Sequence, residues 1–170
     1  MDKYPRDNIA PSDGIPTNLR IGVISDTHGL LRPEALALLE GVGLILHGGD
    51  VGKPEVLEGL RQIAPVVAVR GNVDRAGGTE KLRPWEAVEF AGHWFYLLHN
   101  LAELDLAPAA AGFSAVICGH SHQPSVSRRD GVLYFNPGSA GPRRFSLPVC
   151  LGFIEVGAEG LEARVVEIKS

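Results

Sequence analysis

Short apolar runs alternate with helix-like patterns through the first half of the chain. The expected elements are strands over 20–25, 44–47 and 66–70 and helices over 33–40 and 54–62. Pro33 and Pro54 stand where these helices begin, at a position where a missing backbone N–H does no harm. Because the connections are short crossovers through helices, the pattern predicts a parallel βαβαβ unit.

The second half of the chain changes to a β-rich pattern. Runs at 87–90 and 94–98 flank Ala-Gly-His, which indicates a hairpin with His93 in its turn. A helix is expected over 104–111. Further strands are expected over 114–118, 125–128, 132–135, 149–156 and 161–168. An α/β half followed by a β-rich half predicts two sheets packed face to face with helices outside.

The size of the chain fits one domain. With 170 residues, of which 45% are hydrophobic, it can bury a core of its own. We expect this domain to span residues 20–170. Residues 1–19 mix Pro, Asp, Asn and Gly without periodicity, which predicts an irregular tail to which we assign no function.

Charge and cysteine content narrow the partners and the compartment. The 16 basic and 20 acidic residues give a net charge of -4, which offers no general attraction to nucleic acid. No apolar run reaches the roughly 18 residues of a membrane span, and the N-terminus lacks a signal-like apolar core. Cys118 and Cys150 lie in apolar stretches, as buried thiols in a reducing compartment do. We therefore expect a cytoplasmic protein with no membrane partner.

Five apolar runs end in residues of the types that commonly serve as metal ligands. These side chains are Asp26, His28, Asp50, Asn72, His99, His120 and His122. The carboxyl ends of parallel strands meet at one edge of a sheet, so the side chains are expected to converge there. Asp26 and His28, two residues apart, are expected to share a side of an extended chain and so one ion. His120 and His122 repeat this spacing and can either serve one site together or be divided between neighbouring ions. Taken singly, each residue has a structural alternative as a helix cap or a core histidine. Together they are more donors than one ion needs.

The ordered motifs resemble those of a known family. They are DTH at Asp26, GGD at Asp50, GNVD at Asn72, the position of His99, and GHSH at His120, and they resemble the signature of calcineurin-like metallophosphoesterases. The small size and the NPGSAGPR segment resemble more narrowly the YfcE-like bacterial and archaeal phosphodiesterases. This resemblance implies a four-layer αββα sandwich of two mixed sheets.

The same resemblance implies a ligand set. One ion would take Asp26, His28 and His122, the other Asn72, His99 and His120, and Asp50 would bridge them. The nucleophile would be a metal-bridging hydroxide, so no side chain is assigned as the catalytic nucleophile. The mixture of imidazole, carboxylate and amide disfavours a structural zinc site and an all-oxygen cage. Two divalent ions are expected; the resemblance favours manganese and leaves iron, zinc, cobalt and nickel open.

Several residues near the motifs have expected supporting roles. His47 is interpreted as a donor behind the ligands, and Asp74 as a residue that stabilises its turn or orients a ligand. Asn136 and Ser139 are expected to hydrogen-bond backbone near the site. Arg143 is the preferred phosphate contact, with Asn72 also facing the substrate. Val73 stands where many relatives have a histidine that protonates the leaving group.

The leading hypothesis is a dinuclear phosphodiesterase acting on small or activated diesters. One alternative is a protein-binding scaffold resembling the small subunit of retromer. Another is a phosphomonoesterase or nucleotide pyrophosphatase that uses the same metal pair. Retention of all seven ligand types favours an enzyme, since a scaffold need not keep them. A homo-oligomer stays open.

Overall fold

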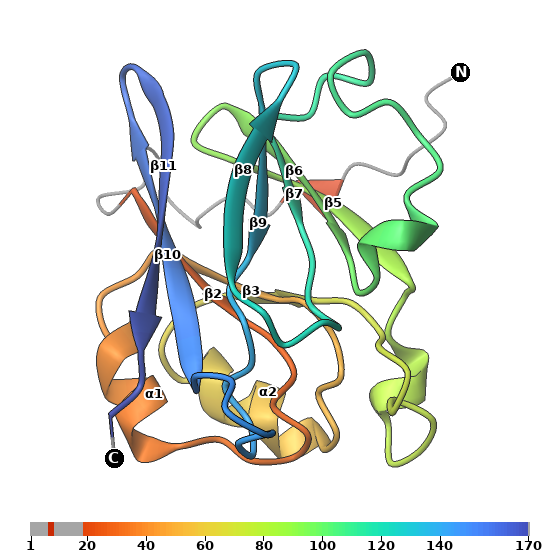
Figure 1. Cartoon of the computed structure of the whole chain (residues 1–170), viewed down its shortest axis with the longest axis vertical. Helices are drawn as coiled ribbons and strands as arrows, with labels where there is room; N and C mark the ends of the chain where they lie inside the picture. The colour runs from red at the N-terminus through yellow and green to blue at the C-terminus, as the bar shows by residue number, and fades with distance from the viewer. Residues whose placement is uncertain (1–6, 9–18, 170) are drawn as a thin grey trace.

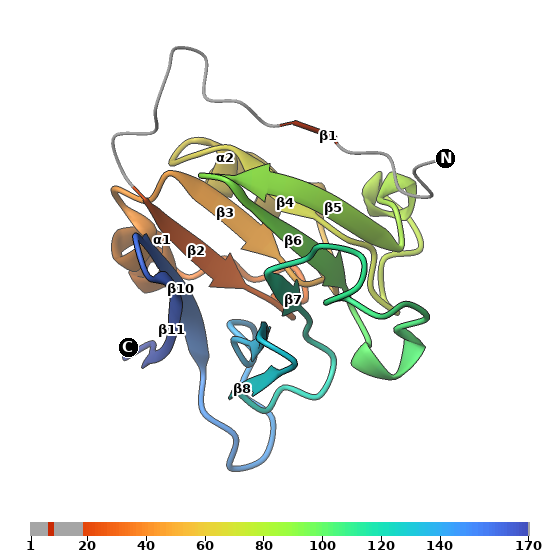
Figure 2. The same cartoon turned by 90° about the horizontal axis from the view of Figure 1, so that it is seen from above.

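Two mixed β-sheets pack face to face in the computed structural model, which describes residues 7–8 and 19–169 (Figure 1). One sheet has the strand order β11-β10-β2-β3-β4 and the other β1-β5-β6-β7-β9-β8. The strands are β1 (Asp7–Asn8), β2 (Arg20–Ile24), β3 (Leu44–His47), β4 (Val66–Ala68), β5 (Trp85–Phe90), β6 (His93–Leu98), β7 (Ala115–Ile117), β8 (Ser125–Arg129), β9 (Val132–Asn136), β10 (Cys150–Gly157) and β11 (Gly160–Glu167). Figure 2 shows the hairpin β10–β11 at one end of its sheet.

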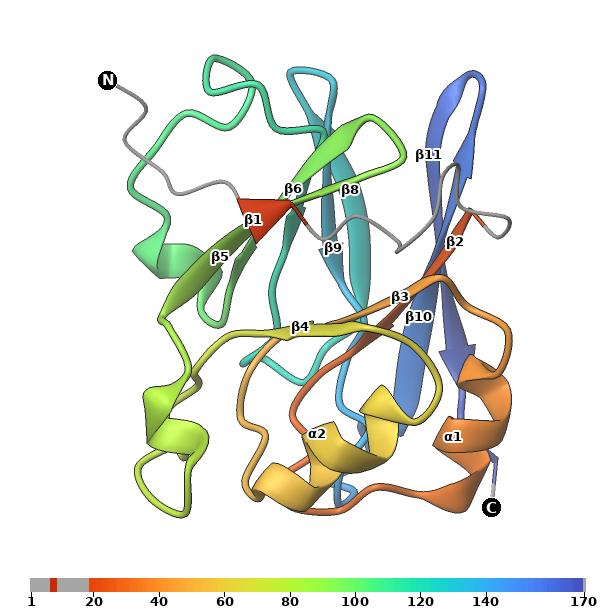
Figure 3. The same cartoon turned by 180° about the vertical axis from the view of Figure 1, so that it is seen from behind.

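The predicted βαβαβ unit is confirmed in the first sheet. Strands β2, β3 and β4 are parallel, and helices α1 (Pro33–Leu39) and α2 (Pro54–Arg61) connect them. Both helices begin with their proline at the first turn. They cover the same face of the sheet (Figure 3), where Leu39 and Leu60 are fully buried. This layer leaves the carboxyl ends of the three parallel strands at one edge.

The core between the sheets follows from alternation along the strands. Ile21 and Val23 of β2 face the second sheet, whereas Ile24 faces the helices. Phe95 and Phe135 fill the space from the opposite side and are fully buried. Because successive side chains of a strand point to opposite faces, each strand of the first sheet supplies both of its cores.

The segment expected to be a helix over 104–111 is not helical, and this prediction was wrong. It contains only the 3₁₀ turn η2 (Leu101–Glu103) followed by bends and turns. Pro108 lies inside the segment, where it removes a backbone donor and disfavours a helix. Leu101, Leu104 and Leu106 still pack on the outer face of the second sheet. The αββα sandwich is therefore confirmed, with an irregular segment as its outer layer on this side.

The hairpin β5–β6 turns one residue earlier than expected. His93 pairs with Phe90 as the first residue of β6 and does not lie in the turn. The turn consists of Ala91 and Gly92, with φ of 50° and 81°. Two successive residues with positive φ form the tight turn whose twist matches that of the flanking strands.

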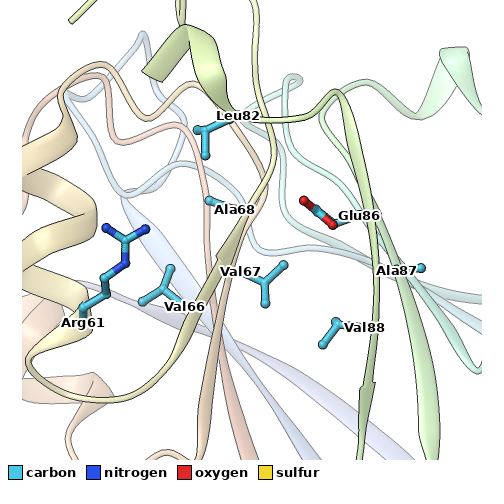
Figure 4. Close-up of a pocket in the computed structure, with 8 residues that line it drawn as sticks. All are labelled: Arg61, Val66, Val67, Ala68, Leu82, Glu86, Ala87 and Val88. Atoms are coloured by element: carbon cyan, nitrogen blue, oxygen red, sulfur yellow. The ribbon is translucent and has the colours of Figure 1, made fainter. Parts of the chain in front are cut away.

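A cavity of about 220 Å³ lies where β4 and β5, from different sheets, approach each other (Figure 4). Its lining is mainly apolar and comprises Arg61, Val66, Val67, Ala68, Leu82, Glu86, Ala87 and Val88. None of the seven candidate ligands lines it. The cavity is therefore separate from the predicted metal site.

Three expectations concern the ends and the surface of the chain. Most of the predicted tail over 1–19 lies outside the described residues, and Asp7–Asn8 pairs in parallel with β5. The domain boundary at residue 20 stays a prediction. Cys118 and Cys150 are buried free thiols, as expected, and burial raises the pKa of each to about 11. Within the described part of the chain, no helix is long and apolar enough to cross a membrane.

The packing of β10 against the second sheet predicts a marked difference between two of its glycines. A β-carbon at Gly152 would collide with the buried ring of Phe135, whereas one at Gly157 would have its nearest neighbour at 3.9 Å. We expect Gly152→Ala to lower the free energy of unfolding by about 1–3 kcal/mol. Gly157→Ala is the matched control and should change it by less than about 0.5 kcal/mol. Urea denaturation measures both, and equal stabilities would contradict this packing.

Candidate metal centre

The carboxylate of Asp26, at the end of β2, has one fixed and one free oxygen. Oδ2 accepts hydrogen bonds from Ser25 Oγ at 2.7 Å and from the His120 N–H at 3.1 Å. Oδ1 is buried and has no hydrogen-bond partner among the described residues. It lies 3.2 Å from Nε2 of His122 and 3.9 Å from Nε2 of both His28 and His99. A buried carboxylate oxygen that faces three imidazoles without a hydrogen bond is suited to bind a metal ion.

Asp50, after β3, is held in the same way. Its Oδ1 accepts the N–H of Val73 at 3.0 Å, while Oδ2 lies 3.3 Å from His99 Nε2 and 3.7 Å from His28 Nε2. Burial alone raises the pKa of Asp50, but the contact with His99, the hydrogen bond from Val73 and the charges of the imidazoles lower it to about 2. The carboxylate is therefore ionised, with one oxygen directed between two histidines.

The imidazole of His99 presents an acceptor to these carboxylates. Its Nδ1 lies 2.7 Å from the carbonyl oxygen of Gly48, which can only accept, so Nδ1 carries the proton. In the neutral ring the buried Nε2 then has a lone pair facing Asp50 Oδ2, and it has no hydrogen-bond partner in the described chain. Burial on its own lowers the pKa of His99, but the contacts with Asp50 and Gly48 raise it above its ordinary value. Two facing acceptors need a proton or a metal ion between them.

The structure brings most of the predicted ligands into two groups. Asp26, His28 and His122 form one, Asp26, Asp50 and His99 the other, and within each group the ligating atoms lie within 4.8 Å of one another. Asp26 belongs to both groups, although the resemblance assigns the bridge to Asp50. Asp50 also reaches both sides through its contacts with His28 and His99. Both carboxylates are thus central.

The two remaining candidates border these groups. The exposed ring of His120 lies edge-on to His99, with centroids 5.1 Å apart. Asn72 is also exposed and follows Gly71, whose backbone packs so closely on Asp50 that a β-carbon would collide with the carboxylate. Both residues are therefore next to the centre, on its open side.

Five of the seven candidates have a left-handed backbone. The φ angles are 54° at Asp26, 48° at His28, 54° at Asp50, 72° at His120 and 61° at His122. Such a conformation costs a residue with a β-carbon roughly 1–2 kcal/mol. Asp26 and His28 do converge, but through a left-handed turn and not through an extended chain. His120 and His122 are divided, since His122 joins Asp26 and His28 while His120 lies against His99. Strain gathered in this way indicates a functional site.

Asp74 fastens the loops that carry the ligands. Its buried carboxylate accepts the N–H groups of Val51 at 3.2 Å, Gly52 at 2.9 Å and Gly71 at 2.8 Å. These bonds join the loop after β3, which carries Asp50, to the loop after β4. The geometry supports the turn-stabilising role rather than the orientation of a ligand side chain.

His47 braces the same region from inside. Its Nδ1 accepts the N–H of Gly49 at 3.1 Å, so its Nε2 donates to Thr27 Oγ1 at 3.0 Å, and Thr27 donates to the Val51 carbonyl at 2.9 Å. Burial, with a smaller effect of His99, lowers the pKa of His47 to about 3. This neutral ring is a support and not a ligand.

The NPGS segment contacts the site as expected. Ser139 Oγ donates to the carbonyl of Asp26 at 3.0 Å, and Asn136 Nδ2 donates to that of Gly119 at 2.9 Å.

Arg143, the predicted phosphate contact, is exposed. The pKa of His122 is lowered, first by burial and also by the positive charge of Arg144. No pattern in the sequence signals the role of Ser25, because this residue belongs to no motif of its own. In the structure its hydroxyl group orients the Asp26 carboxylate.

The chain is similar to known proteins over most of its length. The model of the calcineurin-like phosphoesterase superfamily domain matches residues 19–159. The "probable metallophosphoesterase" of Methanothermobacter thermautotrophicus is 34% identical over 158 residues, which cover 86% of this chain and 91% of the relative. The chain belongs to the calcineurin-like phosphoesterase family. The predicted resemblance is thereby confirmed, and membership places the chain among metal-dependent phosphoester hydrolases.

Solved structures share the calcineurin-like fold with this chain. An archaeal phosphodiesterase has a TM-score of 0.72 at 24% identity, covering 86% of this chain and 99% of its own. YfcE, a phosphoesterase from E. coli, has a TM-score of 0.64 at 23% identity, with coverages of 88% and 100%. Vps29 from Entamoeba histolytica, solved with Zn²⁺, has a TM-score of 0.66 at 20% identity, with coverages of 88% and 99%. The likeness to YfcE is thus confirmed for the fold.

The buried His47 predicts an acid-sensitive stability. Its pKa is 6.5 in an ordinary environment and about 3 in the fold, so between these values the unfolded chain binds a proton that the folded chain does not. The contribution is complete above pH 6.5 and is lost as the pH falls toward 3. We expect the free energy of unfolding to fall by up to about 1.4 kcal/mol per pH unit from this residue. Denaturation of the native chain and of His47→Gln from pH 7 to 4 measures it, and parallel profiles would refute the assignment.

Proposed function

We propose that this phosphoesterase is a dinuclear metal-dependent phosphodiesterase that hydrolyses small or activated diesters. The observation that carries the proposal is the pair of buried, unpartnered acceptors, Asp26 Oδ1 and His99 Nε2, aimed into one cluster of donors. One ion would be held by Asp26, His28 and His122 and the other by Asn72, His99 and His120, with Asp50 between them. We propose manganese for the working enzyme; the donors also suit iron, zinc, cobalt and nickel.

The charge of the site suits a phosphoester. Two divalent ions and the carboxylates of Asp26 and Asp50 would sum to about +2, since neutral imidazoles and the Asn72 amide add nothing. When bound, the ions lower the pKa of water and polarise the phosphoryl group, so the chain need not supply a covalent nucleophile. Asn72, exposed beside the centre, and Arg143 are proposed to contact the phosphate.

The surroundings support further proposals about partners and location. The net charge of -4 supports a site that does not bind nucleic acid in general. The buried free thiols support a cytoplasmic location.

The scaffold alternative draws on the fold shared with Vps29. The strained backbone of five candidate ligands favours the enzyme, because a scaffold gains nothing from left-handed Asp and His at one edge. Charge does not separate diester from monoester hydrolysis, so an assay must compare the two substrates.

The proposal predicts metal binding and a requirement for Asp50. We expect two divalent ions per chain by elemental analysis after dialysis with Mn²⁺, and faster turnover of an aryl diester than of the matching monoester. Asp50→Asn should lower kcat by about 100-fold or more, roughly 3 kcal/mol of transition-state stabilisation. Asp105→Asn changes an exposed carboxylate in the segment after η2 and should leave kcat unchanged.

Three outcomes would count against this proposal. A native chain that binds no divalent ion, or that turns over only monoesters, would refute the dinuclear phosphodiesterase. An Asp50→Asn chain that is folded and fully active would remove Asp50 from the centre. A folded but inactive native chain that captures a protein partner would favour the scaffold.

Val73 predicts a strong dependence on the leaving group. Its side chain is 45% exposed beside Asp50 and carries no proton to donate. Since general acid catalysis is typically worth about 10²–10⁴-fold, alkyl diesters should react more slowly than aryl diesters by at least that order. Val73→His should accelerate alkyl diesters selectively, and Val73→Ala is its control. Rates independent of leaving-group pKa in the native chain would refute the prediction.

A further inference from the structure

Phe145 stands out on the surface of the described chain. Its side chain is 93% exposed, more than any other large hydrophobic residue that the structure describes, and its φ is 53°. A phenyl ring in water forgoes the free energy of burial, and a left-handed backbone adds a cost for a residue with a β-carbon. Neither feature contributes to folding, so this residue is available for a role outside the core.

The loop that carries Phe145 is fixed at its base to the metal centre. Before the tip, Ser139 Oγ donates to the Asp26 carbonyl at 3.0 Å and the Ala140 N–H donates to the Ser25 carbonyl at 3.0 Å. After the tip, the Cys150 N–H returns to the Ser139 carbonyl at 2.9 Å. Both ends of the loop are therefore tied to the chain that positions Asp26.

Gly141 brings this loop directly against the ligand-bearing backbone. A β-carbon there would collide with the carbonyl groups of Asp26 and Thr27, so the two segments are in close contact. Arg32 also donates to the Gly141 carbonyl at 3.2 Å. The tip begins two residues later, so it extends from a base that lies beside the ligand-bearing chain.

The tip combines the aromatic ring with a cation. Arg144 precedes Phe145 directly and is exposed. The turn is closed by the Leu147 N–H, which donates to the Arg144 carbonyl at 3.1 Å. A guanidinium group suits phosphate oxygens, and an exposed ring suits the flat face of an aromatic group.

We propose that Phe145 and Arg144 form the substrate-recognition element of this enzyme, in which the ring stacks on an aryl group or nucleobase esterified to the phosphate. The inference rests on the proposed function, because the phosphate must sit at the metal centre for the tip to reach its substituent. It names the substrate class as aromatic phosphoesters, among them nucleotide-like diesters. Phe145 sets specificity and takes no part in bond cleavage.

Binding of two phosphates that differ in the aromatic group tests the proposal. Calorimetry with Mn²⁺ present compares AMP with ribose 5-phosphate for the native chain, Phe145→Ala and Phe145→Trp. Stacking on one side chain is worth at least about fivefold in affinity, so the native chain should prefer AMP by that factor or more. Phe145→Ala should lose the preference and Phe145→Trp should keep it.

Two further variants separate the roles within the tip. Arg144→Gln should weaken both phosphates by a similar factor and leave their ratio unchanged. Val165→Ala shortens an exposed apolar side chain on β11 and should alter neither affinity. Because Phe145 is exposed, circular dichroism should show that its variants fold like the native chain.

The outcomes distinguish this inference from the proposed function. A native chain without preference for AMP, or a Phe145→Ala chain that keeps the preference, overturns the recognition element even if diesters are hydrolysed. A preference that depends on Phe145 in a chain that hydrolyses no diester supports the recognition element and refutes the phosphodiesterase.

Discussion

The buried carboxylate of Asp26 is the constraint on which the arrangement of the site depends. It sits at the end of a central strand of the first sheet, and two of its hydrogen bonds come from loops of the second sheet. The His120 N–H, after β7, binds its side chain, and Ser139, after β9, binds its backbone carbonyl. Asp26 therefore ties the two sheets together at the same edge where its second oxygen meets the imidazoles. The fold and the site share one set of contacts, so a change in sheet packing would move the ligands.

At this edge the backbone segments pack so closely that some positions have no room for a β-carbon. A β-carbon at Gly119 would collide with the side chain of Ser25, and one at Gly71 would collide with the carboxylate of Asp50. The strands approach each other closely only because these positions have no side chain. At the same edge Asp26, Asp50, His28, His120 and His122 have left-handed conformations, whose cost must be offset by packing elsewhere in the fold. The position of the ligands is thus over-determined, as a preorganised site requires.

The sequence predicts this architecture well where local pattern and global packing agree. The parallel strands could be located because each is a short apolar run that ends in a polar residue, and the clustering of candidate ligands because those ends share one edge. The segment after β6 could not, since its leucines pack on the outer sheet from an irregular chain that contains Pro108. The left-handed turns carry no compositional signal when they hold Asp and His instead of Gly. The contact of Gly141 with the chain at Asp26 depends on how the loop after β9 folds back, which no local pattern encodes.

The buried residues of the site determine the reaction, whereas the exposed residues around it determine which substrate is selected. Asp26, Asp50, His99 and His122 are buried and held by bonds to both sheets, so their geometry has little freedom to change without unfolding the edge. Val73 and Phe145 are exposed and make few demands on the core. Substitution at these outer positions can therefore alter the substrate while leaving the metal-binding geometry intact. A family that shares the inner residues would share its chemistry, and its members would differ in the residues that surround the open side of the centre.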